Sequence, residues 1–194
     1  MFKKAWKERY EGIVEYRPKH KVVDVDAATN TLKFEFNDDV KASVLNVIPD
    51  MRAGDIAVKS GLATANKRWC EVDFLTFESV AVKNVQVLGD SIQIATAMPK
   101  SEHMANQHGK TCAAAVVALL TGKQPNSLPI YNNTCYSFVS DEDVVHVASV
   151  HRYDAEKKTM LTVPGSGGVS AAANELEGRY ALAWARNIWA DTLA

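Results

Sequence analysis

The sequence lacks several patterns that would assign a function directly. It contains no Gly-x-Gly-x-x-Gly segment and no Cys-x-x-Cys pair, the local signatures of a dinucleotide-binding turn and of many zinc sites. Its 3 cysteines are too few for a disulfide scaffold, and their odd number means that at least one is free or pairs outside the chain. No apolar run approaches the roughly 20 residues that a membrane-spanning helix needs. Neither a metal site nor a membrane span is predicted.

The sequence also lacks an excess of charge of either sign. Lys and Arg total 22 against 23 Asp and Glu, so the formal net charge is -1 and nucleic acid, which requires a basic face, is not a predicted partner. Hydrophobic residues make up 47% of the chain, enough for a real core. The first residues, Met1 to Arg9, lack the apolar centre of a signal peptide. Either the protein is cytoplasmic or its natural start lies upstream, and composition does not choose.

The amino-terminal region predicts a helix followed by short strands. Met1 to Tyr10 has an aromatic residue at every fourth position, which is typical of one face of a helix. Alternating apolar residues with polar turns between them then predict an antiparallel meander. Its three strands are expected at residues 21–26, 31–36 and 40–48.

The middle of the chain predicts half of a βαβ unit. The apolar run Val85 to Leu88 is expected to form a strand that stops at Gly89-Asp90. A long helix is then predicted from about Lys100 to Leu120, because Gly122 is placed to end it. Strand, loop and helix in this order are typical of α/β nucleotide-binding folds. The last region predicts strands at 135–139, 144–150 and 160–163 and a helix opened by a capping box, Asn174 with Glu177.

The junction between this strand and this helix is the candidate binding site. In open α/β sheets, ligands bind outside the carboxyl ends of the strands. The carboxylate of Asp90 would accept hydrogen bonds from ligand hydroxyls there, and Gly89 would let the backbone approach closely. The start of the helix, where Pro99 suits the first turn, carries a partial positive charge that favours an anionic group such as a reduced flavin. On the dipeptide alone, an ordinary turn before a packing helix is the more frequent interpretation.

The surrounding residues resemble one family. The segments Val87-Leu88-Gly89-Asp90, Ala97-Met98-Pro99-Lys100-Ser101 and Cys112 to Leu120 resemble the second FAD-binding motif of the flavin subunit of flavocytochrome c sulfide dehydrogenases. The resemblance extends over nearly the whole chain. It includes these further segments: Asn46-Val47-Ile48-Pro49, Arg68-Trp69-Cys70, Thr76-Phe77-Glu78-Ser79, Asn133-Thr134-Cys135-Tyr136-Ser137, Val163 to Gly168, and the closing helix Tyr180 to Leu193.

The resemblance implies an activity and roles for individual residues. A flavoprotein of this family oxidises hydrogen sulfide beside a redox-active disulfide and passes electrons to a c-type cytochrome subunit in the periplasm. Cys135 would be half of that disulfide, and Trp184 would lie near the reaction site. Six residues would bind FAD: Gly89, Asp90, Met98, Pro99, Lys100 and Ser101. By residue type alone, Cys135 is equally well a half-buried thiol, and Trp184 a packing residue.

The resemblance also implies that the chain is the carboxyl-terminal part of a longer flavoprotein. The first FAD-binding segment and the partner of Cys135 would precede Met1. The expected fold is an incomplete FAD/NAD(P)-binding Rossmann-like α/β fragment with an antiparallel meander and a carboxyl-terminal α+β domain. Its divisions are expected at residues 1–48, 49–125 and 126–194. Two alternatives remain: a sulfide:quinone-type oxidoreductase, and a non-catalytic module that binds a protein partner without flavin. His108 and Glu102 depart from the family pattern.

Overall fold

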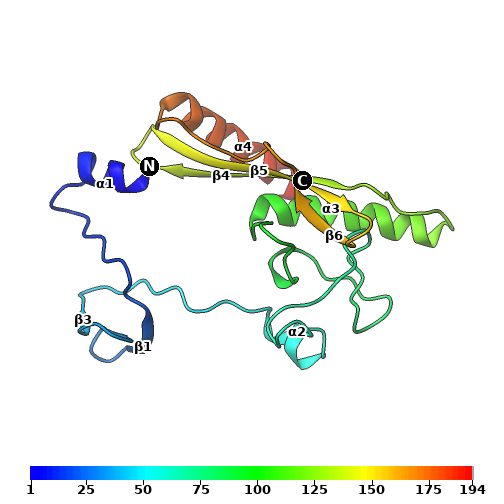
Figure 1. The fold of residues 1–194 in the computed structure, drawn as a ribbon, viewed down its shortest axis with the longest axis horizontal. Helices are drawn as coiled ribbons and strands as arrows, with labels where there is room; N and C mark the ends of the chain where they lie inside the picture. Colours follow the sequence, from blue (N-terminus) through cyan, green and yellow to red (C-terminus); the bar gives the residue numbers. More distant parts are fainter. Residues whose placement is uncertain (194) are drawn as a thin grey trace. The chain divides into compact units, whose positions relative to one another are not determined.

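The chain folds into two compact units. The computed structural model describes residues 1–193, and its units are Phe2–Met51 and the part that begins at Arg52 (Figure 1). None of the helices described in residues 1–193 has both the length and the apolar character that crossing a bilayer requires.

The first unit contains one helix and the predicted meander. Helix α1 (Phe2–Arg9) precedes β1 (Val22–Asp26), β2 (Thr31–Phe34) and β3 (Val40–Lys41), which pair antiparallel in that order. The turn between β1 and β2 forms because the Asp26 carboxylate accepts hydrogen bonds from the residues that follow it. The meander prediction is confirmed, although β3 is shorter than expected.

This unit has no buried core. Every residue from Phe2 to Met51 is at least partly exposed, including Val44 and Ile48 at 83% and 80%. The exposure agrees with the short β3, because no side chain beyond Lys41 in this unit is fully buried. Folding free energy comes mainly from burying apolar surface, and the unit has little of this stabilisation of its own.

The second unit contains the rest of the described elements. A short helix α2 (Asp55–Lys59) and a 3₁₀ turn η1 (Gly89–Ser91) precede the long helix α3 (Glu102–Leu120). An antiparallel sheet follows, made of β4 (Ile130–Phe138), β5 (Val144–Asp154), β6 (Thr159–Thr162) and β7 (Gly168–Val169). The strands β4, β6 and β7 each pair with β5. Helix α4 (Glu175–Leu193) closes the chain. These elements confirm the predicted α/β class.

The core of this unit lies between α3, the irregular segment before it and the sheet. Figure 1 shows α3 beside β4 and α4 along β4 and β5, and these are the helix–sheet pairs in contact. The side chain of Tyr131 on β4 contacts Phe77 of the irregular segment and His108 of α3, and all three side chains are almost completely buried. The buried cluster is Phe74, Phe77, Ile92, Ala95, Met98, Met104, Cys112, Tyr131, Tyr153 and Met160.

The predicted strand at Val85–Leu88 is wrong. Only Gln86 forms an isolated bridge, to Glu78, and the two neighbouring hydrogen bonds close a local loop. A strand requires a neighbouring strand for its backbone groups, and no long partner lies beside this run in residues 1–193. The half βαβ unit is therefore replaced by a bridge, the turn η1 and helix α3.

Candidate functional site

The turn η1 brings Gly89 and Asp90 against helix α3. Gly89 is buried and has φ +67°, a conformation that glycine adopts without strain. A Cβ at this position would lie 3.3 Å from the Cβ of Ala105, so the close approach of η1 to α3 leaves no comfortable room for a side chain. Asp90 follows with an exposed side chain. The predicted neighbours, an acidic residue and the start of a helix, are thus brought together, although no strand leads into them.

The start of α3 is capped by Ser101. Its hydroxyl oxygen accepts a hydrogen bond from the backbone N–H of Met104 at 3.1 Å, which is the normal role of an N-cap serine. The N–H groups of Glu102 and His103, in the first turn, have no partner within the helix and point outward from its start. The partial positive charge there favours an anionic group. Half-buried Pro99 leads into this start.

A hydrogen-bonded chain joins the N-cap of α3 to Cys135. The Ser101 hydroxyl donates to Asn133 Oδ1 at 2.6 Å, and Asn133 Nδ2 lies 3.2 Å from the sulfur of Cys135. Asn133 is 3% exposed, whereas Cys135 is exposed. The thiol is thus accessible and held on the same side of β4 as the helix start. Asn133 was not predicted as a site residue, because only the fold places it between the two.

Two of the predicted cofactor-binding side chains are occupied inside the protein. Met98 is 1% exposed and its side chain packs in the core, where it anchors the residues that precede α3. The ammonium group of Lys100 donates to the backbone oxygens of Asp90 and Ile92 at 2.6 and 2.7 Å, and lies 3.8 Å from the centre of the Trp69 ring.

The predicted catalytic residue Trp184 lies beside both β4 and the first turn of α3, where its ring centre is 5.6 Å from that of His103. Trp184, on α4, packs against Tyr136 with ring centres 6.3 Å apart. Tyr136 and Cys135 are consecutive in β4, so their side chains point to opposite faces. Trp184 also lines an open cleft of about 350 Å³ between α3, β4 and α4. The cleft is lined by His103, Asn106, Gln107, Lys110, Asn132, Trp184, Asn187, Ile188 and Asp191.

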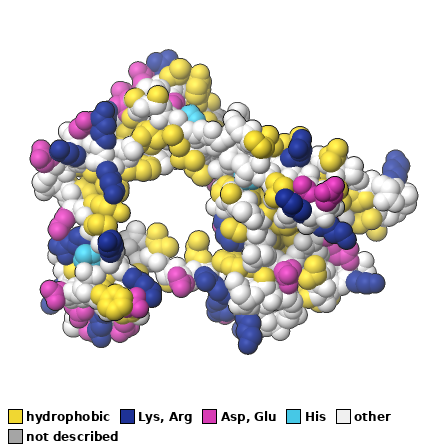
Figure 2. Space-filling model, viewed as in Figure 1, with side chains coloured by type: hydrophobic (Ala, Val, Ile, Leu, Met, Phe, Trp, Pro, Cys, Tyr) yellow, Lys and Arg dark blue, Asp and Glu magenta, His cyan; other side chains and the backbone are white. Residues whose placement is uncertain are grey.

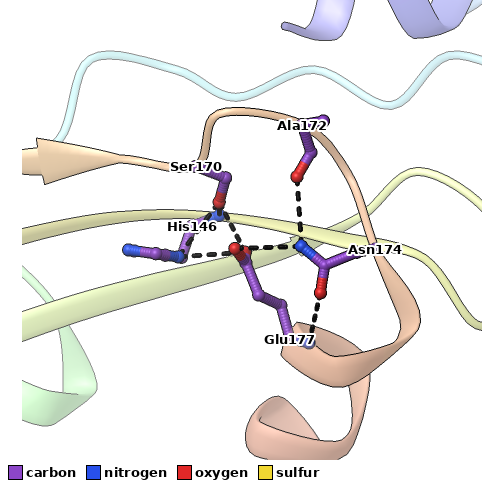
Figure 3. A network of polar contacts seen from close by, with 5 residues as sticks. All are labelled: His146, Ser170, Ala172, Asn174 and Glu177. Atoms are coloured by element: carbon purple, nitrogen blue, oxygen red, sulfur yellow. Dashed lines mark hydrogen bonds and ion pairs between the residues drawn. The ribbon is translucent and has the colours of Figure 1, made fainter.

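A second polar cluster fixes the start of α4 to β5 (Figure 3). Asn174 and Glu177 bond to each other as the capping box predicts. Glu177 Oε2 also accepts a hydrogen bond from the Ser170 hydroxyl and lies 2.9 Å from His146 Nδ1. Burial acts to raise the pKa of Glu177, but the hydrogen bonds from Ser170, His146 and Asn174 outweigh it and hold the pKa below its usual value.

This cluster is structural rather than nucleophilic. Ser170 is 5% exposed, and its hydroxyl accepts the backbone N–H of His146 while donating to Glu177. A serine nucleophile needs an accessible oxygen with its proton directed at a base. The Ser170 oxygen is not accessible, so the cluster serves to hold α4 against the sheet. The sequence indicated only half of the cluster, through the Asn174–Glu177 spacing.

Two family models match the chain, one at each end. Residues 1–49 match the family described as "Sulfide dehydrogenase [flavocytochrome c] flavoprotein chain, central". Residues 127–193 match the family described as "Flavocytochrome c sulphide dehydrogenase, flavin-binding". The second match contains Cys135 and Trp184, while Gly89, Asp90 and the start of α3 lie between the two matched regions.

The cofactor of the matched flavin-binding domain is FAD, and the residues around the start of α3 fit part of such a group. The first-turn N–H groups favour the negative charge of a reduced flavin ring, and the exposed carboxylate of Asp90 is an acceptor for hydroxyl groups. Glycine at position 89 keeps the backbone of η1 close to the helix start.

Proposed function

Because the chain belongs to the flavocytochrome c sulfide dehydrogenase flavoprotein family, we propose that it forms the carboxyl-terminal part of an FAD-dependent enzyme that oxidises hydrogen sulfide and passes the electrons to a c-type cytochrome subunit. The observation that carries the proposal is the pair of matches, to two different domains of one flavoprotein, in a single chain. The exposed first unit, which lacks a core of its own, supports a place within a larger domain. A periplasmic location is part of the proposal.

The residues near α3 have distinct tasks in this proposal. FAD supplies the two-electron acceptor for the oxidation of sulfide. Asp90 accepts hydrogen bonds from the ribityl hydroxyls, and the start of α3 faces the pyrimidine edge of the ring. Ser101 orders that start through its bond to Met104. Pro99 contributes a backbone without an N–H group.

Cys135 acts on sulfur in this proposal. Its thiol is exposed, while Cys70 and Cys112 are buried, so a disulfide partner for Cys135 is expected from outside the chain. Hydrosulfide then attacks one sulfur of that disulfide, forming a new S–S bond and releasing the other sulfur as a thiolate. Burial raises the pKa of the Cys70 and Cys112 thiols, which makes both weaker nucleophiles. Trp184 supports β4 through Tyr136 and the first turn of α3 through His103.

A non-catalytic module is the second candidate, favoured by one observation. Leu182, Trp189 and Leu193 on α4 are 53%, 60% and 80% exposed, and their spacing places them along one side of the helix. Hydrophobic side chains are visible on the molecular surface in Figure 2. A stripe of this kind is typical of a helix that packs against another protein.

Sulfide-dependent reduction of a c-type cytochrome separates the two candidates. The chain is co-expressed with an amino-terminal flavoprotein half that carries the Gly-x-Gly-x-x-Gly segment, and the complex is loaded with FAD. We expect sulfide to reduce the cytochrome, and Cys135→Ser to abolish the reaction while the complex still forms. A complex that binds FAD but gives no reduction with sulfide contradicts the enzymatic proposal. A quinone that is reduced in preference to the cytochrome indicates a sulfide:quinone-type oxidoreductase instead.

A further inference from the structure

Lys100 is held by three groups within the chain. Its ammonium donates hydrogen bonds to the backbone oxygens of Asp90 and Ile92, at 2.6 and 2.7 Å. These two oxygens flank the end of the turn η1. The third group is the indole ring of Trp69, whose centre lies 3.8 Å from the ammonium nitrogen. This separation is well within the range of a cation–π interaction, and tryptophan is the strongest partner for one.

The backbone beside Trp69 also forms hydrogen bonds at this turn. The N–H of Cys70 donates to the oxygen of Ser91 at 3.0 Å, and the N–H of Gln93 donates to the oxygen of Cys70 at 2.7 Å. Together these bonds form a parallel bridge between Cys70 and Ile92, both 0% exposed. The turn that carries Asp90 is therefore bonded both to the backbone beside Trp69 and to the side chain of Lys100.

The ammonium group of Lys100 is partly buried, and its charge acts on neighbouring groups of the same unit. Burial lowers the pKa of Lys100, since water is partly removed from the ammonium group. The same charge helps to lower the pKa of His108, whose ring is 2% exposed in the core beneath. Two of the three ammonium protons are directed at η1, and the side chain is only partly exposed.

We propose that Lys100 and Trp69 form a clamp that positions the turn η1, and with it Asp90, at the start of α3, so that Lys100 acts on the flavin site through η1 and not through contact of its ammonium with FAD. The clamp involves only this chain. Its importance for FAD rests on the function proposed above, because Asp90 is the residue that the clamp would present to the cofactor. Lys100 is thus a positioning residue, and Trp69 is its partner.

Amide hydrogen exchange tests the clamp without any cofactor. The reporters are the N–H groups of Cys70 and Gln93, which bond across η1. A hydrogen bond to a charged group stabilises by about 1.5–3 kcal/mol, so Lys100→Met should accelerate exchange at both reporters about tenfold or more. Trp69→Leu should accelerate it by a smaller factor. Lys110→Met is the matched control, because Lys110 lies on the adjacent helix α3 but pairs with Asp191.

The outcomes of the exchange experiment are distinct. Faster exchange at the reporters with unchanged exchange in β4 and β5 supports a local clamp. Lys100→Arg should then restore most of the protection, since a guanidinium keeps the charge and stacks on tryptophan. Unchanged reporters in Lys100→Met overturn the proposal. Equal acceleration in the sheet also overturns it, because Lys100 would then stabilise the whole core and not the turn.

A second measurement asks how the clamp affects the cofactor. In the FAD-loaded complex with the amino-terminal half, Lys100→Met should weaken FAD binding about tenfold and leave the flavin midpoint potential unchanged. A drop in that potential would mean that the ammonium stabilises the reduced ring directly, which contradicts positioning through η1. If the unmodified complex fails to bind FAD, the proposed function is refuted, while hydrogen exchange still decides the clamp.

Discussion

Acidification should destabilise the second unit, and the core histidine His108 should contribute strongly to this loss. Its ring is 2% exposed and packs 4.8 Å from Phe77 and 5.1 Å from Tyr131, measured between ring centres. Neither ring nitrogen has a hydrogen-bond partner among the described residues. Burial, with a smaller contribution from the charge of Lys100, lowers the pKa of His108 from 6.5 to about 4. The fold therefore strongly favours the neutral ring.

The size of the effect follows from this difference. Between pH 6.5 and 4 the unfolded chain binds a proton at His108 and the folded chain does not, so stability falls as the pH falls through this window. Each pKa unit corresponds to 1.36 kcal/mol, so the free energy of unfolding should decrease by about 3 kcal/mol across the window because of His108. Above pH 6.5 this group contributes no further change.

Urea unfolding followed by tryptophan fluorescence measures the effect. The comparison is between the unmodified chain and His108→Leu, which removes the titrating ring but keeps an apolar side chain of similar size. His103 and His151, whose pKa values are also lowered by burial, remain in both proteins and cancel in the difference. The variant should lose about 3 kcal/mol less between pH 7 and pH 4. Identical losses in the two proteins would refute the assignment of the effect to His108.

Further substitutions test packing, capping and thiol exposure. Gly178→Ala should lower the free energy of unfolding by about 1–3 kcal/mol, because an added Cβ on α4 collides with the backbone oxygen of Glu142. Gly109→Ala, in open space on α3, should raise the free energy of unfolding by about 0.5–1 kcal/mol. The midpoints of urea unfolding compare the two variants. Equal midpoints would contradict this packing. Ser101→Ala should cost about 1 kcal/mol by the same measurement, through loss of the N-cap. Iodoacetamide should modify Cys135 about tenfold or more faster than the two buried cysteines, as peptide mass spectrometry would show; comparable rates would contradict its exposure.

Elements with a long local pattern were predictable from the sequence. The helix at Glu102–Leu120 was predicted from about Lys100 with Gly122 placed to end it, and the helix at Glu175–Leu193 from the capping box at Asn174 and Glu177. Strand β4 was predicted to begin at Cys135 but begins at Ile130, because pairing with β5 extends it through polar residues. The apolar run at Val85–Leu88 failed as a strand for the converse reason, since no neighbouring strand lies beside it.

The site was predictable in part. Gly89 and Asp90 were placed just before a long helix from local chemistry, and Ser101 was assigned through the family resemblance; the structure brings all three to the start of α3. Contacts between distant segments were not predictable: the Lys100–Trp69 pair and the Ser101–Asn133 contact depend on how the chain folds back on itself. The same reason explains why the contacts of Trp184 with Tyr136 and His103 emerged only with the fold.

Binding of FAD by matched variants tests the central claim most directly. The chain is assembled with the amino-terminal flavoprotein half and titrated with FAD, and binding is followed by flavin fluorescence. Asp90→Ala should weaken binding about 10- to 100-fold, because the ribityl hydroxyls lose a charged acceptor, and Asp90→Asn should be affected less. Unchanged affinity in Asp90→Ala would contradict the assignment of η1 and the start of α3 as the second FAD-binding segment.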